Sequence, residues 1–460
     1  MYKILPKLIL VCYLGICSQV NALTVDDYTN KLLKNHPYFL QLSLAEKAAL
    51  VGEKVALTYT DWSMVGSLNN TNTDGDSLTS RTYNDLNVTS YKVSAKKTIA
   101  KTGANISLNH SWGRNNRDGV ITGENVTSVD YSRPLLQNRN GLNNKLNADI
   151  ATIEIAAQSL SRIEQTEGFI SNKINRLINL ALAQEKETIY HQQLAIASTQ
   201  LELAENKLKY ALIDQSDFLS EVDAKYRAEQ QWLQSQSELT LLRQELAALV
   251  DIQESEMFLE FDLYQQHDIA QVDSETILPS LRVIQQIQIE RQKLLRQKQS
   301  LENKLLPSIN LNVGFSTEGN GNNYLDGFSN QGQSWRMGFD VSYPLGQNKS
   351  MLELVQSDIS LAHLNARQRE IAINTKQQIN TLVLQINLLR KTMDINQSQV
   401  QVAEDKVLEE GLKFENARGQ KSLLFSAQKA LNLMKLSYAQ TAANYQINVV
   451  EYRSVIDQLM

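Results

Sequence analysis

The chain of 460 residues has little of what many small exported proteins and nucleic-acid-binding proteins depend on. It has two cysteines, Cys12 and Cys17, and both lie in the first 20 residues. If that segment is removed, neither a disulfide framework nor a Cys-ligated metal site is possible. The formal net charge of −5 and the pI near 5.7 lack the basic excess that nucleic-acid binding needs.

The N-terminus has the pattern of an export signal. A basic start at Lys3 is followed by an apolar run from Leu8 to Val20 and by the small-residue site Val20-Asn21-Ala22. This predicts a signal peptide over residues 1–22, cleaved after Ala22. The apolar run is shorter than the ~20 residues that a membrane anchor requires. Lipidation at Cys17 is an alternative, which the bulky Ile16 before it disfavours.

Proline is absent from long stretches in which a helical period is strong. The segment from Lys349 to about Lys413 predicts one helix roughly 95 Å long, at about 1.5 Å per residue. Apolar residues recur along it at alternating steps of three and four, which indicates a coiled-coil seam. The seam is Ile379, Leu382, Ile386, Leu389, Met393, Asn396, Val400, Ala403 and Val407. The rest of the surface is polar, so such a helix needs neighbours of similar length.

The same order of elements occurs twice, which predicts a two-fold internal repeat. The first copy spans 23–250, with a helix, strands over about 61–133 and long helices over about 140–212 and 216–250. The second copy spans 275–460, with a helix, strands over about 308–343 and long helices over about 349–413 and 420–457. Residues 251–274 connect them. Leu208-Lys209-Tyr210 matches Leu412-Lys413-Phe414 at an offset of 204.

Two strand regions alternate apolar and polar residues with a period of two. We expect one side of the second region to face lipid: Ile309, Leu311, Val313, Trp335, Met337, Phe339 and Val341. Polar loops are predicted at Thr71–Thr82, Arg114–Asn125 and Thr317–Ser334. A soluble β-sandwich would also alternate. The export signal, and the lack of a second apolar layer for a sandwich to pack on, favour a membrane β-barrel.

Four strands are clear, and the hairpin that turns at Ala100–Gly103 would raise the number to six. A barrel needs about eight strands to close, and an open sheet in lipid leaves its edge groups unsatisfied. The chain must therefore oligomerise. Three copies would supply about 12 or 18 strands.

At this point the chain resembles the TolC-type outer-membrane efflux protein family over essentially its whole mature length. The resemblance is carried by Asn35-His36-Pro37, by Pro134-Leu135 and Pro344-Leu345 before long helices, and by two similar tip segments. The tips contain Tyr210 with Ser216-Asp217-Phe218-Leu219, and Phe414 with Gly419-Gln420-Lys421-Ser422-Leu423-Leu424.

This resemblance implies an α+β membrane protein. A homotrimer would form a transmembrane β-barrel continued by a long coiled-coil α-helical barrel. It would lie in the outer membrane of a Gram-negative bacterium, with a large periplasmic part. Its partners would be outer-membrane lipid, a periplasmic adaptor (membrane fusion) protein and an inner-membrane pump. The function implied is an exit duct of a tripartite efflux pump or a type I secretion system, which passes small molecules or proteins outward.

The tips hold the candidate functional residues. Some members of the family place two aspartates near the second tip as a constriction, but Leu423 and Ser426 stand there in this chain. The gate candidates are Leu423, Ser426, Asp214, Asp217, Glu221, Glu410 and Glu415. The candidates for adaptor docking are Tyr210, Ser216, Leu219, Phe414, Gly419 and Ser422.

No motif indicates an enzyme, a cofactor or a metal site. The five histidines are scattered without ligand spacing, and Gly319–Asn322 is typical of a loop rather than a nucleotide cradle. The alternative to a duct is an exported coiled-coil structural or adaptor protein with a small soluble β domain. A third hypothesis is an adhesin or stalk.

Overall fold

The computed structural model describes residues 23–74, 85–269, 272–329, 331–343, 345–346 and 348–459. The predicted signal peptide, Pro344 and most of the predicted loop Thr71–Thr82 lie outside the described residues. The chain divides into two compact units. Of the described residues, unit 1 holds those up to Leu40, those within Gln165–Ser274 and those from Lys376 onward, and unit 2 holds those within Gln41–Glu164 and Glu275–Thr375.

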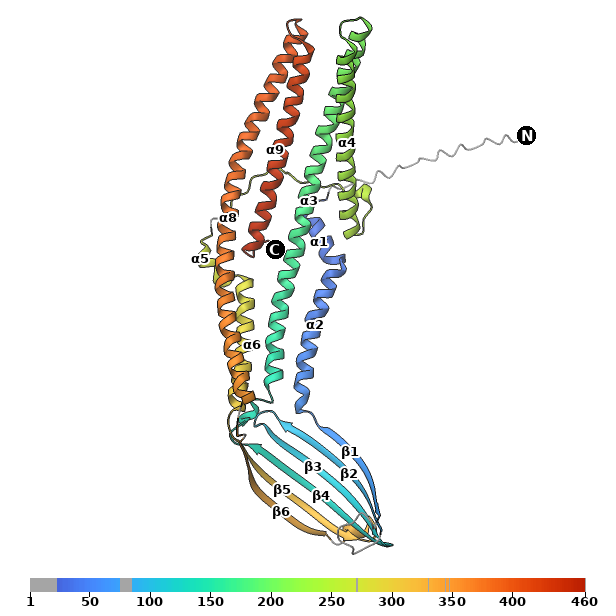
Figure 1. Ribbon diagram of the computed structural model, residues 1–460, viewed down its shortest axis with the longest axis vertical. Helices are drawn as coiled ribbons and strands as arrows, with labels where there is room; N and C mark the ends of the chain where they lie inside the picture. Colours follow the sequence, from blue (N-terminus) through green and yellow to red (C-terminus); the bar gives the residue numbers. More distant parts are fainter. Residues whose placement is uncertain are drawn as a thin grey trace, which may run out of the picture. The chain divides into compact units, whose positions relative to one another are not determined.

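Unit 2 contains one antiparallel sheet of six strands in the order β1-β2-β3-β4-β5-β6 (Figure 1). Their bounds are β1 Ser63–Asp74, β2 Asp85–Ile99, β3 Ala104–Arg117, β4 Val120–Pro134, β5 Ser308–Gly321 and β6 Gln331–Ser342. The hairpin at Ala100–Gly103 thus belongs to the sheet, and six strands rather than four is the correct number. The strands β1 and β6 are the two edges.

The predicted loop at Arg114–Asn125 is wrong. Strands β3 and β4 run through most of it, and the turn is confined to Asp118 (φ 47°) and Gly119 (φ 88°). Two residues with positive φ form the kind of tight hairpin whose twist matches that of the strands. The polar residues around this turn look like a loop in the sequence, yet backbone pairing does not require apolar side chains.

The predicted loop at Thr317–Ser334 is also shorter than expected. Strand β5 continues to Gly321, and the short helix α7 (Asp326–Ser329) lies within the connection to β6. Asn125 on β4 donates a hydrogen bond from Nδ2 to the carbonyl oxygen of Tyr324 at 2.6 Å. The connection is therefore fastened to the sheet.

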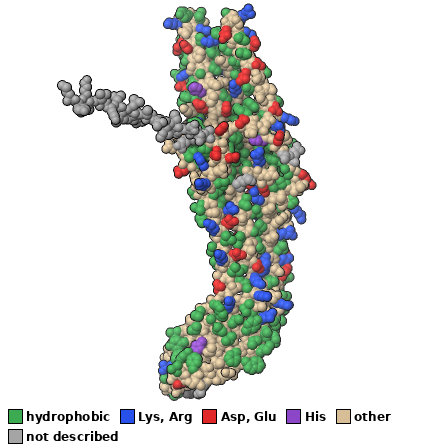
Figure 2. All heavy atoms as spheres, turned by 180° about the vertical axis from the view of Figure 1, so that it is seen from behind, with side chains coloured by type: hydrophobic (Ala, Val, Ile, Leu, Met, Phe, Trp, Pro, Cys, Tyr) green, Lys and Arg blue, Asp and Glu red, His purple; other side chains and the backbone are tan. Residues whose placement is uncertain are grey.

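The register of the strands gives the sheet two chemically different faces. One row of paired residues across all six strands is Met64, Ala95, Leu108, Val129, Phe315 and Trp335. The next row, on the opposite face, is Val65, Ser94, Asn109, Ser128, Ser316 and Ser334. The predicted alternation is confirmed, and all seven residues expected to face lipid share the apolar face. Figure 2 shows hydrophobic side chains gathered over the sheet.

The helical part of unit 2 consists of α2 (Pro37–Leu57, from residue 41), α6 (Arg282–Lys304), and the first parts of α3 (Leu146–Lys209) and α8 (Asn348–Glu415). Ion pairs connect these helices. Arg162 lies 3.0 Å from Glu46 and Arg282 lies 2.9 Å from Glu164. Lys298 lies 2.6 Å from Asp358. The four helices therefore form one bundle next to the sheet.

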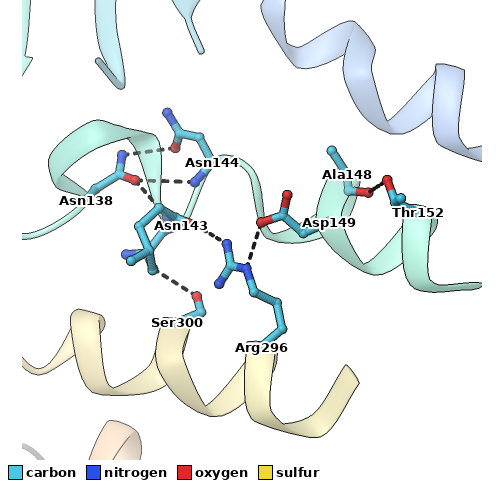
Figure 3. A network of polar contacts seen from close by, with 9 residues as sticks. Asn138, Asn143, Asn144, Ala148, Asp149, Thr152, Arg296 and Ser300 are labelled. Carbon is cyan, nitrogen blue, oxygen red and sulfur yellow. Dashed lines mark hydrogen bonds and ion pairs between the residues drawn. The ribbon is translucent and has the colours of Figure 1, made fainter. Parts of the chain in front are cut away.

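A polar network fastens the turn before α3 to α6 (Figure 3). Asn138, with a left-handed φ of 60°, accepts the backbone N–H of Asn143 on Oδ1 at 2.9 Å. Ser300 donates to Asn143 Oδ1 at 2.9 Å, and Arg296 Nε donates to Asp149 at 2.7 Å. The start of α3 is thereby held where strand β4 ends.

Unit 1 contains two long hairpins, α3–α4 and α8–α9, with α1 beside them (Figure 1). The remaining bounds are α1 Val25–Asn35, α4 Gln215–Leu249, α5 Ser274–Ile277 and α9 Lys421–Val455. The predicted seam of α8 is its buried side: five of its positions are buried and the other four are half-buried. Asn396, the one polar seam residue, donates from Nδ2 to Thr441 Oγ1 on α9 at 2.9 Å.

The connector after α4 is an extended segment that is held by side chains of α9. Tyr445 accepts the backbone N–H of His267 at 2.8 Å and donates its hydroxyl to the His267 carbonyl at 3.0 Å. Gln446 Nε2 donates to the carbonyls of Leu263 and Gln265. Leu23 pairs with Leu259 in a single parallel bridge, so the start of α1 is held to the connector as well.

Across the described residues, none of the helices combines the length and the apolarity that a membrane-crossing helix needs.

Candidate functional site

The two tips are helix–helix turns of the same type. At the first, Ala211 has a left-handed φ of 56°. Its N–H donates a hydrogen bond to the carbonyl of Leu208, and the N–H of Leu212 donates to the carbonyl of Lys207 at 2.8 Å. At the second, Ala417 has a left-handed φ of 54°. Its N–H donates a hydrogen bond to the carbonyl of Phe414, and the N–H of Arg418 donates to the carbonyl of Lys413 at 2.8 Å. Both are Schellman motifs, which satisfy the last carbonyls of a helix.

The hairpins match at an offset of 206 residues, as Ala211 and Ala417 do. The helices that follow, α4 and α9, both have 35 residues. Both also end with a left-handed aspartate, Asp251 at φ 56° and Asp457 at φ 58°. The sequence match at 204 is therefore shifted by two residues, because it aligned Tyr210 with Phe414, whereas the turn aligns Leu208 with Phe414.

A groove of about 720 Å³ lies between the two hairpins near these turns. From the first hairpin it is lined by Asp217 and Glu221, and from the second by Phe414 and Ser422. Two gate candidates and two docking candidates are thus brought together. The groove also contains two cations, so its charge is mixed. Its lining is Gln200, Leu203, Ala204, Lys207, Ile213, Asp217, Ser220, Glu221, Phe414, Gln420, Lys421, Ser422 and Phe425.

The other gate candidates lie outside this groove. Leu423 is 52 % exposed, and Ser426 is also exposed and donates its hydroxyl to the Ser422 carbonyl at 2.9 Å. Asp214 is the N-cap of α4, where its side chain accepts the N–H of Asp217 at 3.1 Å. Glu410 is half-buried and accepts a hydrogen bond from Lys413 at 2.8 Å, which raises the pKa of Lys413. Glu415 is exposed on the last turn of α8.

The docking candidates differ in how exposed and how closely packed they are. Tyr210 is 73 % exposed at the first turn, and Leu219 and Ser216 are exposed on the first turns of α4. Gly419 is packed against the end of α8. A Cβ added there would lie 3.0 Å from both Lys413 Cβ and Phe414 N. This glycine is needed for a close approach of the backbone, so it is unsuited to a contact through a side chain.

Two residues of the second tip were missed by the sequence analysis. Lys421 lies over the rings of Phe414 and Phe425, with Nζ 5.8 and 5.6 Å from their centroids. Phe425 is buried beneath the lysine. An aromatic residue before the turn and a lysine and an aromatic residue after it are a signal for such a cation–π cluster.

The exposed side of α9 that begins at Leu423 and Ser426 is mostly small and polar. It continues through Leu433, Ser437, Gln440, Asn444 and Glu451, which are exposed, and through Asn448, which is half-buried. A helix side of this composition is suited to contact with water rather than with another helix.

The connector contributes a titratable group. Burial, followed by the positive charge of Arg453, lowers the pKa of His267 below its ordinary value. The neutral imidazole is therefore favoured where the connector lies against α9. In the described residues no group of three or more His, Cys, Asp or Glu is placed to hold a metal ion.

Comparison with solved structures identifies the fold class: the chain has the fold of outer-membrane channel proteins. The sequence resemblance is thereby confirmed for the fold of the single chain. No family model and no curated protein matches the sequence.

Three structures represent the likeness. The outer membrane protein VceC of Vibrio cholerae has 12% identity and a TM-score of 0.68, over 94% of this chain and 95% of that one. The CmeC outer membrane channel of Campylobacter jejuni has 11% identity and a TM-score of 0.70, over 95% and 86%. The open-state MtrE outer membrane channel of Neisseria gonorrhoeae has 12% identity and a TM-score of 0.63, over 95% and 89%. At such identities the likeness is one of fold alone.

Proposed function

We propose that this chain is one subunit of an outer-membrane exit duct, in which three copies close a β-barrel that continues as a coiled-coil α-helical barrel. One observation carries the proposal. The sheet has a row of six apolar residues on one face, and its paired neighbour row on the other face is polar in five of six positions. A wall between lipid and a water-filled lumen needs this arrangement.

The edges of the sheet support closure by copies of the same chain. Each edge strand, β1 and β6, has 12 residues, enough to cross the hydrocarbon layer at the tilt of barrel strands. An edge left open in lipid would have unsatisfied N–H and C=O groups. Pairing β1 of one copy with β6 of the next removes both edges, and three copies give about 18 strands.

Exposed apolar stripes on the helices support the same assembly. In unit 2, α2 exposes Leu44, Val51 and Val55, and α8 exposes Leu352, Val355 and Ile359. In unit 1, α4 exposes Leu219, Tyr226, Leu233 and Leu241, and α8 exposes Leu384, Leu388, Ile395 and Val402. Apart from the step of eight between Leu233 and Leu241, the spacing is three, four or seven residues, as in coiled-coil contacts. These stripes are suited to packing between copies, and the polar side of α9 is suited to lining a wet tunnel.

The matching hairpins support a two-fold internal repeat. We divide the chain into a signal peptide (1–22), a first copy (23–250), a connector (251–274) and a second copy (275–460). Equal helix lengths and equal turns at an offset of 206 suit a duplicated hairpin. Two similar hairpins per chain would make a trimer a ring of six similar units.

The tips would dock on a periplasmic adaptor that links the duct to an inner-membrane pump, in a tripartite efflux pump or a type I secretion system. A photo-reactive label tests this at exposed positions whose side chains serve no cap. We expect a label at Gln215→Cys or Arg418→Cys to cross-link to an adaptor protein in intact cells. A label at Lys96→Cys, on the sheet, is the matched control. Labelling of residue 215 or 418 from outside intact cells would contradict the orientation.

Membrane fractionation followed by planar-bilayer recording tests the duct itself. We expect the protein in the outer membrane, extractable with detergent only, as a trimer that conducts ions. The rival hypothesis, an exported coiled-coil adaptor with a soluble β domain, predicts protein in the soluble periplasmic fraction without detergent. That result would overturn the proposal.

A further inference from the structure

Charged side chains lie in one row across the polar face of the sheet. One row of paired residues, from β1 to β6, is Ser63, Lys96, Ser107, Asp130, Gly314 and Arg336. The charged members of this row are two cations, Lys96 and Arg336, and one anion, Asp130. Because the cations are in excess, we name these three residues the cationic belt. Together with Asp340 they line a groove of about 730 Å³ on this face.

The ion pair of the belt reaches across an entire strand. Arg336 on β6 pairs with Asp130 on β4, and β5 lies between them. Gly314 makes the crossing possible, because a Cβ at this position would lie 2.7 Å from both Arg336 Nε and Asp130 Oδ1. Any side chain at position 314 would displace the guanidinium. The absence of a side chain at Gly314 therefore makes room for Arg336 beside Asp130.

The carboxylate of the belt is shielded, whereas its cations are exposed. Asp130 Oδ2 accepts hydrogen bonds from Asn109 Nδ2 at 3.0 Å and from Ser128 Oγ at 2.9 Å, and its side chain is only 25% exposed. The side chain of Arg336 is 69% exposed, and Lys96 is also exposed. The second acid of the groove, Asp340, is exposed and accepts a hydrogen bond from the Asn312 amide. Within the belt, the ammonium of Lys96 and the guanidinium of Arg336 are therefore more accessible to a passing solute than the carboxylate of Asp130.

We infer that the cationic belt determines charge selectivity inside the barrel and favours small anionic solutes. The inference rests on the proposed duct, in which the polar face lines the lumen and three copies repeat the belt. The Debye length at physiological ionic strength is about 8 Å, so exposed charges on the wall act on ions that pass close to it. Charged rings set selectivity in pores by this effect.

Adjacent lysines on opposite faces supply a matched test. Lys96 belongs to the belt, whereas Lys97 lies on the apolar face with Nζ 5.8 Å from the centre of the Trp62 ring. Reversal potentials in a KCl gradient give the chloride-to-potassium permeability ratio of the trimer. We expect Lys96→Gln and Arg336→Gln each to lower this ratio about twofold or more. Lys97→Gln should leave it unchanged, and Asp130→Asn should raise it.

Arg336→Lys separates charge from packing, because it keeps the cation but loses the planar contact over Gly314. A ratio close to that of the wild type in this variant supports the inference. Two results would refute the inference about the belt while leaving the proposed duct unaffected. In the first, Lys96→Gln and Lys97→Gln change the permeability ratio equally; in the second, both leave it unchanged in a conducting protein. A wild-type trimer that inserts into the bilayer and never conducts would overturn both.

Discussion

Val313 and Asn312 are neighbours on β5 whose side chains lie on opposite faces of the sheet. Val313 is paired with Tyr131 and Met337 on the apolar face, and the Asn312 amide bonds Asp340 on the polar face. We expect Val313→Arg to cost about 2 to 4 kcal/mol in membrane assembly if it lies near the bilayer centre. Asn312→Arg should be nearly silent, since it adds a cation beside Asp340. Equal loss of heat-stable trimer in both variants would contradict the assignment of the faces.

The exposed Leu423 and Ser426, in place of acids, are the basis of a second prediction. A ring of leucines excludes ions by dewetting, whereas a ring of carboxylates attracts cations. In planar bilayers we expect Leu423→Asp to raise cation selectivity and block by multivalent cations relative to the wild type. Asp217 and Glu221 lie in the groove with Lys207 and Lys421, which offset their charge.

A different outcome would relocate the gate. Strong cation selectivity in the wild type that Leu423→Asp leaves unchanged, and that Asp217→Asn removes, would assign the constriction to the first tip. Because Asp217 is exposed and is not the cap of α4, its substitution should leave the turn intact.

At this scale the sequence predicted the faces of the strands but not the contacts at the tips. Alternation along a strand is local, so Ile309, Leu311 and Val313 could be assigned to one face from their spacing alone. The approach of Asp217 to the second hairpin depends on how two distant hairpins pack. The crowding at Gly419 depends on a turn whose conformation no single residue specifies.

The helical turns hold two alanines in a conformation that favours glycine. The left-handed region costs an L-residue about 1 to 2 kcal/mol, and Ala211 and Ala417 both occupy it. We expect Ala211→Gly and Ala417→Gly each to increase the free energy of unfolding by about 0.5 to 1 kcal/mol. Ala195→Gly, at an exposed position inside α3, should decrease it by about as much. Thermal unfolding in detergent measures all three, and destabilisation by the turn variants would contradict the geometry.

The connector should loosen in acid. Because the pKa of His267 is lowered by burial and by Arg453, folding favours its neutral form. Its contribution to stability is fully present above its ordinary pKa of about 6.5, and it is lost as pH falls from there toward the lowered value. As the pH falls from 7.5 to 5.5 we expect the amide protection factors of residues 259–268, which correct for the slower intrinsic exchange in acid, to decrease more in the wild type than in His267→Gln. An equal decrease in both proteins would assign the effect to other groups.

Long elements were predictable, and short polar ones were not. The helix predicted over about 349–413 is observed as Asn348–Glu415, because a sustained seam without proline leaves few alternatives. The sequence predicts a loop at the polar ends of β3 and β4, where the strands in fact pair, because Asn, Arg and Gly are also common in turns. Alternating bulky side chains reveal the middle of a strand in the sequence. Its polar ends are defined by backbone pairing, which leaves no such pattern.

A single copy of the chain leaves the edges of its sheet unpaired and apolar surfaces of its helices uncovered. Its sheet ends in two edge strands of 12 residues, and its helices expose apolar stripes at coiled-coil spacing. The sequence already indicated oligomerisation, because four or six strands are too few for a barrel. The number of copies cannot be read from local patterns, since it depends on the curvature that a closed ring adopts.

Disulfide cross-linking between the edge strands in outer membranes tests this account most directly. Because both natural cysteines precede residue 23, a pair introduced on the polar face would be the only thiols once the chain is cleaved at the proposed signal-peptide site. Ser67→Cys on β1 would be combined in turn with Ser334→Cys, Gly338→Cys or Ser342→Cys on β6, to sample the unknown register between copies. We expect one pair to give cross-linked dimers and trimers with no larger product, whereas Ser67→Cys alone gives monomers. A ladder that continues beyond three copies, or only monomers with every pair, would contradict a closed trimer.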